Sequence, residues 1–496
     1  MFRDQGNFSP RPKPEPLGRD VWRVGVVVLL GAMMSVLDTT IVNVALETLG
    51  KDLDAGLDQI QWVATGYMLA LAAVIPLTGW AARRFGAKQV YLTSLILFTA
   101  SSALCGLAPS VGALIGFRIL QGFAGGMLLP IGQMMMADAA GPQRMGRVMG
   151  LIGVPTMLAP ILGPTLGGAI IDNLSWQWIF YVNVPIGIVA VIAAWRVLPR
   201  PAREKADPLD VRGLLLASTG VPLVTYGLAE IGATGGFTSP KVIVPIVAGL
   251  ALVALFVRHA LRARFPLLDM RLYRRPTFSA ASFTVFALGG AMFGAMILVP
   301  LYYQGIRGET AFDTGLLLGP QGIALALTMP VAGRLTDRYG GGPLAVCGVT
   351  LTAVMTIPFA LIGPDTSIPF LCLALSLRGV GVALSFMPVM AAAFATLDRS
   401  ELSDATPQLN VLLRVGGSIG TAVLSVILYR SLDGAATPAA QASAYGAAFW
   451  GATALTAAAI IPAIILMRAE RRARAQNAQA PPPAEQREAL IEAAAV

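Results

Sequence analysis

The chain has 496 residues, of which 55% are hydrophobic and only 13% are charged. Soluble domains carry charge on about a quarter of their residues, so this composition excludes a soluble globular protein and indicates a polytopic membrane protein. The formal net charge of +9 comes from basic residues spread over short segments between apolar runs, which indicates membrane topology rather than nucleic-acid binding.

The first 20 residues are polar and rich in proline, and they lack the features of a signal peptide, so we expect a disordered cytoplasmic tail. Because about 20 apolar residues span a bilayer, the runs that follow predict about fourteen transmembrane helices. They lie at 24–46, 59–80, 90–108, 112–137, 148–171, 178–198, 213–233, 241–261, 277–302, 314–333, 344–363, 368–395, 405–429 and 444–467. Cys105, Cys347 and Cys372 fall within such runs without metal-ligand spacing, which indicates neither a metal site nor a disulfide framework.

The loops after every second span carry basic residues, as at Arg83 and Lys88 and again at Arg144 and Arg147. The intervening loops are neutral or acidic, as at 47–58. By the positive-inside rule, both termini are predicted to be cytoplasmic.

An internal repeat predicts an architecture built by duplication. Residues 76–86 and 330–340 match in register, and each lies at the predicted cytoplasmic end of a span. Repeats of this kind build many transporters around a site near the middle of the membrane. We therefore expect an all-α polytopic membrane protein of two six-helix bundles related by pseudo-two-fold symmetry, with two extra helices between them. The predicted order is a tail at 1–20, the first bundle at 21–200, linkers and the extra helices at 201–275, the second bundle at 276–468, and a basic and then disordered tail at 469–496.

Asp38 interrupts the first apolar run and is the leading candidate for a functional group. An ionised carboxylate at the bilayer centre costs roughly 2.5 to 3.5 kcal/mol on the insertion scale, so we expect Asp38 to face a protein cavity. It lies roughly 21 Å into the first span, and Arg118 lies at a similar depth in the fourth. A neighbouring guanidinium favours the ionised carboxylate and loss of water favours the protonated one, so the pair can act as a proton-coupling device. The alternative is a structural ion pair that locks two helices.

Several strings together resemble the fourteen-helix drug:proton antiporter branch of the major facilitator superfamily. The loops GWAARRFG at 79–86 and GRLTDRYG at 333–340 are similar to the signature loop of that superfamily. Four further strings narrow the resemblance: LDTTIVNVAL at 37–46, QWVATGY at 61–67, RILQG at 118–122 and GPTLGG at 163–168. The likeness covers nearly all of 24–467, and it implies binding of a proton or of a cationic substrate by Asp38 and proton coupling by Arg118.

The resemblance also assigns gating roles to the two loops and to the fifth span. The residues are Gly79, Arg83, Arg84, Gly86, Gly163, Pro164, Gly167, Gly168, Gly333, Asp337, Arg338 and Gly340. The glycines and prolines of the fifth span predict a tight, bendable seam between the two halves, which the family uses to prevent leakage. The alternative is ordinary packing of small residues.

The first loop departs from the family pattern because Arg83 stands where an acidic residue is usual, and only the second loop keeps the acid, as Asp337. A negative charge is favourable at a helix N-terminus and a positive one is not. We therefore expect the latch at the cytoplasmic side to depend on Asp337, on Asp138 or on lipid phosphates.

The spans contain flexible methionines, aromatic rings and a few polar groups, which suit an apolar cavity that binds many different ligands. For each of these residues taken alone, packing in the core or contact with lipid explains its presence equally well. The candidate cavity residues are Met33, Met34, Asn43, Trp62, Tyr67, Gln121, Met127, Gln133, Met134, Phe286, Met292, Phe293, Tyr302, Arg378, Met387, Asn410 and Arg414. Three arginines against one aspartate leave an anionic or zwitterionic substrate open.

The sequence contains no metal-ligand cluster, no Ser/His/Asp set and no phosphate-binding Gly-x-x-x-x-Gly-Lys string, which argues against an enzyme and against ATP as the energy source. The leading hypothesis is a proton-coupled multidrug exporter in a bacterial plasma membrane. It would be driven by the proton gradient without a cofactor, would act as a monomer, and would contact amphiphilic substrates, protons and lipids but no nucleic acid. The alternatives are a dedicated exporter of one endogenous lipid, siderophore or antibiotic, and a non-transporting sensor on the same fold.

Overall fold

The computed structural model describes residues 18–141, 144–199, 207–234, 236–363 and 365–479, which form helices joined by short turns and contain no strand. Helices are expected here because a backbone in lipid must satisfy its own hydrogen bonds. Thirteen helical segments of the described chain are long and apolar enough to cross a membrane. Helix α6 (Met145–Asn173), whose side chains are described only in part, coincides with the fifth predicted span. The total of fourteen spans and the cytoplasmic position of the termini stay predictions.

The first bundle contains the helices from α1 to α8. Their bounds are α1 (Arg19–Asp52), α2 (Leu57–Val74), the 3-10 helix η1 (Ile75–Leu77), α3 (Thr78–Phe85), α4 (Ala87–Gly106), α5 (Val111–Ala140), α6 (Met145–Asn173), α7 (Trp178–Tyr181) and α8 (Asn183–Val197).

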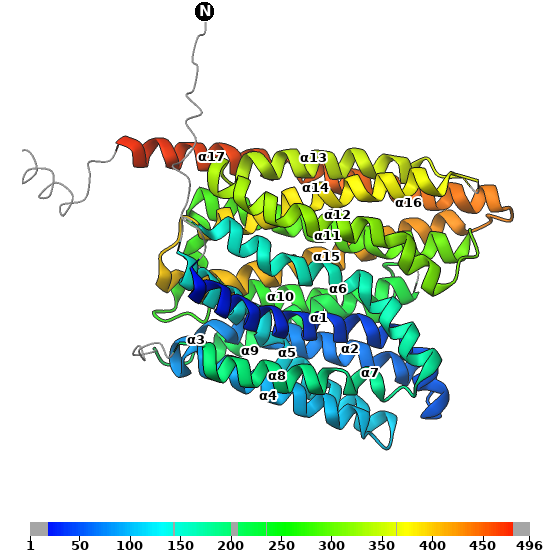
Figure 1. The fold of residues 1–496 in the computed structure, drawn as a ribbon, viewed down its shortest axis with the longest axis horizontal. Coiled ribbons are helices and arrows are strands. Elements are labelled where there is room, and N and C mark those ends of the chain that lie inside the picture. Colours follow the sequence, from blue (N-terminus) through cyan, green and yellow to red (C-terminus); the bar gives the residue numbers. More distant parts are fainter. Residues whose placement is uncertain (1–17, 142–143, 200–206, 235, 364, 480–496) are drawn as a thin grey trace, which may run out of the picture.

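The extra pair is α9 (Val211–Thr234) with α10 (Pro240–Arg262), followed by the 3-10 helix η3 (Met270–Arg274). The second bundle contains α11 (Pro276–Gly305), α12 (Ala311–Tyr339), α13 (Gly341–Ala360), α14 (Ile368–Phe394), the 3-10 helix η4 (Arg399–Glu401), α15 (Leu402–Leu432), α16 (Pro438–Ala458) and α17 (Ile460–Gln479). Figure 1 shows the two bundles as adjacent layers of long helices with roughly common direction.

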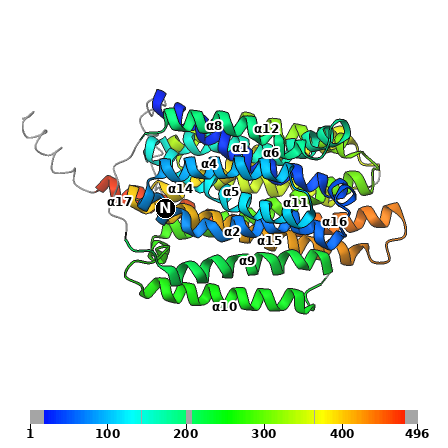
Figure 2. The same cartoon turned by 90° about the horizontal axis from the view of Figure 1, so that it is seen from below.

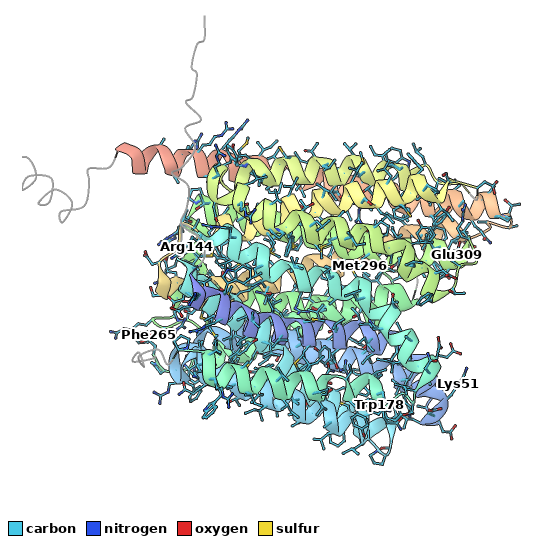
Figure 3. The ribbon with its side chains drawn as sticks, viewed as in Figure 1. Lys51, Arg144, Trp178, Phe265, Met296 and Glu309 are labelled. Carbon is cyan, nitrogen blue, oxygen red and sulfur yellow. The ribbon has the colours of Figure 1, made fainter. Side chains whose placement is uncertain are left out.

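The two ends of the molecule differ in charge. Arg144 and Phe265 lie at the end where α17 projects, whereas Lys51, Trp178 and Glu309 lie at the other (Figure 3). We call the first the basic end, since the arginines at the C-terminal ends of α3 and α12 and in the segments after α5 and α10 lie there, and the second the opposite end.

The repeated loops adopt the same turn. Gly86 ends α3 and begins α4 with φ 88°, and Gly340 ends α12 and begins α13 with φ 96°. Residues other than glycine rarely adopt a backbone conformation with positive φ, so both positions require glycine for the same reason. The match between the two strings therefore extends to their backbone geometry.

The apolar core is shared at one end and divided at the other. Near the basic end, one buried cluster contains residues of both bundles, such as Met149 on α6, Met329 on α12 and Leu402 on α15. Toward the opposite end, the first bundle has a cluster of its own that includes Leu49, and the second has another that includes Tyr302. The bundles are thus packed together at the basic end and have separate cores at the opposite end.

The extra pair lies along one face of the molecule, with α9 between α10 and the two bundles (Figure 2). Helix α9 contacts both α2 and α15. Ser218 Oγ donates to the Ala73 carbonyl at 2.5 Å, and the rings of Trp62 and Tyr226 stack with centroids 5.9 Å apart. The pair therefore covers the side on which α2 and α15 border the boundary between the bundles.

Helix α17 continues through Gln479, so the basic part of the predicted C-terminal tail is helical in the structure. Glu470 accepts hydrogen bonds from the backbone amides of Gly341, at 3.3 Å, and Gly342, at 2.7 Å. A carboxylate is favourable at a helix N-terminus, so this contact fixes α17 against the start of α13. The N-terminal tail predicted at 1–20 is too long, because α1 begins at Arg19; its residues 1–17, and residues 480–496 of the predicted C-terminal tail, lie outside the described residues.

Candidate functional site

Asp38 lies in the interior of the first bundle, where three side chains from other helices donate to its carboxylate. Arg118 Nη1 on α5 approaches Oδ2 at 2.5 Å, while Gln121 Nε2 on α5 and Asn183 Nδ2 on α8 approach Oδ1 at 2.9 and 3.0 Å. Asp38 is 0% exposed and Arg118 is 1% exposed. Asp38 and Arg118, which were predicted to lie at a similar depth in the membrane, are therefore in direct contact.

The Arg118 guanidinium is held from several directions. Its Nε donates to the Val63 carbonyl at 3.2 Å, and its second contact from Nη1 is Gln121 Oε1 at 2.7 Å. The ring of Tyr67 lies 4.0 Å from the guanidinium carbon, a distance at which cation and ring attract each other. The arginine is therefore fixed by α2 as well as by α1 and α5.

Tyr67 is in turn positioned by α1 and α5. Its hydroxyl lies 3.3 Å from Ser35 Oγ and donates to the Ser35 carbonyl at 3.2 Å. A Cβ at Gly125 would lie 3.0 Å from the Tyr67 hydroxyl and 3.1 Å from Ser35 Oγ, so a small residue is needed at that level of α5. Glycine on α5 is what allows the ring to reach the arginine.

Asn183 is a residue of the site that was not predicted from the sequence. Its side chain also contacts Ser102 Oγ at 3.2 Å, and Ser102 Oγ donates to the Phe180 carbonyl at 2.9 Å. A lone asparagine within the apolar sixth run was an available signal, because a polar group in a membrane span needs a partner. The partner itself could not be identified from the sequence.

Asp337 connects the two bundles at the basic end. Its Oδ1 accepts from the backbone amide of Gly146 and its Oδ2 from Arg147 Nε, both at 2.8 Å, at the start of α6. A carboxylate at a helix N-terminus is stabilised by the unpaired amides and by the helix dipole. The acid kept by the second loop therefore forms the contact expected of a latch.

Arg83 also forms a contact across the bundles, which the sequence argument did not foresee. Arg83 Nη1 lies 3.3 Å from Asp404 Oδ1 in the first turn of α15, and the same nitrogen donates to Ser403 Oγ. A Cβ at Gly79 would collide with the Ser403 carbonyl oxygen, so the loop and α15 are in close contact. In the second loop the acid Asp337 pairs with Arg147 of α6, whereas in the first loop the base Arg83 pairs with the acid Asp404 of α15. The two loops thus form ion pairs of opposite polarity.

The glycines of α6 pack against two different neighbours. Gly163 and Gly167 do not form a seam between the halves, because they contact α1 of their own bundle at Thr40 and Ile41. Gly146, Gly150 and Gly153 instead contact the second bundle, and Gly146 and Gly150 both lie against α12. Residues four apart share a helix face, so the two sets form separate stripes on α6. Gly168 has open space beside it, and the side chain of Pro164 lies outside the described set.

The predicted cavity residues fall into several environments. Asn410 Nδ2 on α15 donates to Gln133 Oε1 on α5 at 2.8 Å, a buried contact between the bundles. Trp62 lies against α9, and Phe293 packs on Gly417 within the second bundle. Asn43 is exposed. Of the rest, Met34, Tyr302, Arg378 and Met387 are buried, and Met33, Met127, Met134, Phe286, Met292 and Arg414 are partly exposed.

Comparison with known proteins supplies a family. The profile of the Major Facilitator Superfamily matches residues 28–421. The chain is 38% identical to the Multidrug resistance protein B homolog of Mycobacterium tuberculosis over 84% of its own length and 78% of that protein. It is 33% identical to the Multidrug export protein EmrB of Haemophilus influenzae over 81% and 79%. The fold is similar to that of the proton:xylose symporter XylE, with a TM-score of 0.60 and 13% identity over 89% of this chain and 94% of the other.

Proposed function

Since the chain belongs to the Major Facilitator Superfamily, we propose that it is a proton-coupled exporter of hydrophobic and amphiphilic toxic compounds. Its relatives bear the names of multidrug resistance and export proteins, and the family consists of transporters rather than enzymes. We place it in the plasma membrane of a bacterium, where it works as a monomer and is driven by the proton gradient without a cofactor.

The observation that carries this proposal is the buried pair of Asp38 and Arg118. Protonation of Asp38 would remove the charge that three donors surround and would leave Arg118 without its counter-ion. Removing one partner of a buried ion pair costs about 3 to 5 kcal/mol, so the protonated state favours a rearrangement of α5 relative to α1. Binding and release of a proton can in this way bias the arrangement of the helices.

The second part of the proposal is alternating access between the bundles. The shared core and the contacts of Asp337 and Arg83 hold the basic end together, while the cores are separate at the opposite end. If the basic end is cytoplasmic, this arrangement is closed toward the cytoplasm, and export requires the latch contacts to break and re-form in each cycle.

The test is uphill accumulation of substrate inside everted membrane vesicles under an imposed pH gradient, which corresponds to efflux from the cell, with ethidium and other chemically unrelated compounds as substrates. Asp38→Asn keeps the shape of the side chain but cannot ionise, and we expect it to abolish uphill efflux of every compound. Glu47→Gln, at an exposed position of the same helix, is the matched control and should transport normally.

Persistent efflux with a normal pH response in D38N would show that Asp38 is structural. Proton-coupled flux of a single compound, with no flux of the others, would favour a dedicated exporter over a multidrug one.

A further inference from the structure

Four charged side chains lie six or more residues inside the described spans: Asp38, Arg118, Arg378 and Arg414. Asp38 is fully engaged by Arg118, Gln121 and Asn183 and is 0% exposed. The remaining two charges are both positive. The middle of the molecule therefore has an excess of cationic groups and offers no free carboxylate among its described residues.

Arg414 lies on the face of α15 that meets the first bundle. It is one helical turn from Asn410, and residues four apart share a helix face. Asn410 forms the hydrogen bond to Gln133 of α5 across the boundary of the bundles. The guanidinium of Arg414 lies within electrostatic range of Tyr67, the ring that supports Arg118. Arg414 is thus directed toward the place where the bundles meet, and it is only partly buried there.

Within the described part of the chain, neither remaining arginine has an acidic partner. Arg378 is 4% exposed, and its Nε donates to Thr356 Oγ1 at 3.3 Å, a neutral acceptor inside the second bundle. A guanidinium deep in a membrane protein is costly unless it is paired or reached by water, and such residues commonly mark a substrate path. Arg118 meets this requirement with Asp38, whereas Arg414 is left to meet it with a ligand or with water.

The planar guanidinium forms paired hydrogen bonds with carboxylate, sulfonate and phosphate groups, and it also stacks on aromatic rings. We propose that Arg414 binds the anionic headgroup of an amphiphilic substrate between the two bundles. A positive charge at this place lowers the energy of an anion and raises that of a cation. The inference rests on the proposed export function and narrows its substrate class to organic anions with an apolar body.

The experiment compares two fluorescent probes that share an aromatic skeleton, anilinonaphthalene sulfonate, which is anionic, and phenylnaphthylamine, which is neutral. Proton-driven flux of both is measured in proteoliposomes containing the full chain, with ethidium as a cationic reference. We expect the wild type to transport the sulfonate. Arg414→Gln should lower the ratio of sulfonate flux to phenylnaphthylamine flux about ten-fold, the value of one charge-assisted hydrogen bond.

Two further variants separate charge from structure. Arg414→Lys keeps the charge and should recover most of the sulfonate flux. Arg430→Gln, at an exposed position of the same helix, should leave the flux ratio unchanged.

Equal losses of both probes in R414Q, an unchanged ratio, or a wild type that transports ethidium but no sulfonate would each overturn the proposal while leaving the export function intact. Absence of flux for all three probes in the wild type would instead refute the export function itself.

Discussion

The ion pair between Arg83 and Asp404 can be tested by reversing the charge of each residue in turn. The two charged groups lie 3.3 Å apart, and their side chains are 23% and 18% exposed. Coulomb attraction at this separation is about 5 kcal/mol at an effective dielectric constant near 20, and most of it is offset by desolvation and by lost side-chain freedom. We take the net contribution to closure of the basic end as about 1 to 2 kcal/mol, which corresponds to about a 5- to 30-fold change in the ratio of closed to open molecules.

Arg83→Asp and Asp404→Arg should each open the basic end by at least this factor, since each places like charges side by side. The double variant R83D/D404R restores the attraction with its sign inverted and should return the ratio most of the way to the wild-type value. The assay is the distribution of distances between spin labels on the turn at 85–87 and at the start of α15, in a background with the three cysteines replaced.

Arg84→Asp is the matched comparison, because it makes the same change of net charge at an exposed neighbouring position and should open the end less. The reasoning is refuted if the double variant is as open as the more open single variant, because the two effects would then not be coupled. It is also refuted if R84D opens the end as much as R83D, because overall charge and not the pair would be responsible.

Two further predictions concern packing and hydrogen bonding. A Cβ at Gly333 would lie 2.7 Å from the Gly146 carbonyl oxygen and 2.9 Å from the Arg147 Cα, so G333A should push α12 away from α6 and shift the spin-label distances toward the open form. The control is G116A, because nothing lies within 4 Å of a Cβ at that position. Equal shifts in the two variants would contradict the prediction. Asn183→Ala removes one of three donors from a buried carboxylate, so it should lower the thermal unfolding temperature by the equivalent of about 1 to 3 kcal/mol and reduce proton-coupled efflux. Asn173→Ala, at an exposed position, should change neither, and an unchanged melting temperature for N183A would show that its hydrogen bond to Asp38 contributes little.

The elements of the candidate site were foreseen unevenly. Asp38 and Arg118 could be found because a charge in an apolar run is conspicuous, and their common level follows from the rise of a helix through a layer of fixed thickness. Asp337 could be found because its loop matches a known pattern. Asn183 was missed because a single amide in an apolar run has many potential partners, and the partner of Arg83 was missed because Asp404 is far away in sequence.

By itself, the sequence determined the properties that depend on position along a single helix. The apolar runs set which segments can span a membrane, the basic loops set the predicted orientation, and the repeated glycines at Gly86 and Gly340 set matching turns. Depth belongs to this group, because each residue adds a constant rise along the helix axis.

The tertiary structure decided which helix faces which. It placed Gly163 against α1 and Gly146 against α12, although both lie on one helix and both are glycine. It also placed α9 against α2 and α15, and Arg83 beside Asp404. In a membrane most faces of a helix are apolar, so hydrophobic pattern distinguishes them poorly, and close packing of small residues and pairing of polar groups between distant segments fix the arrangement.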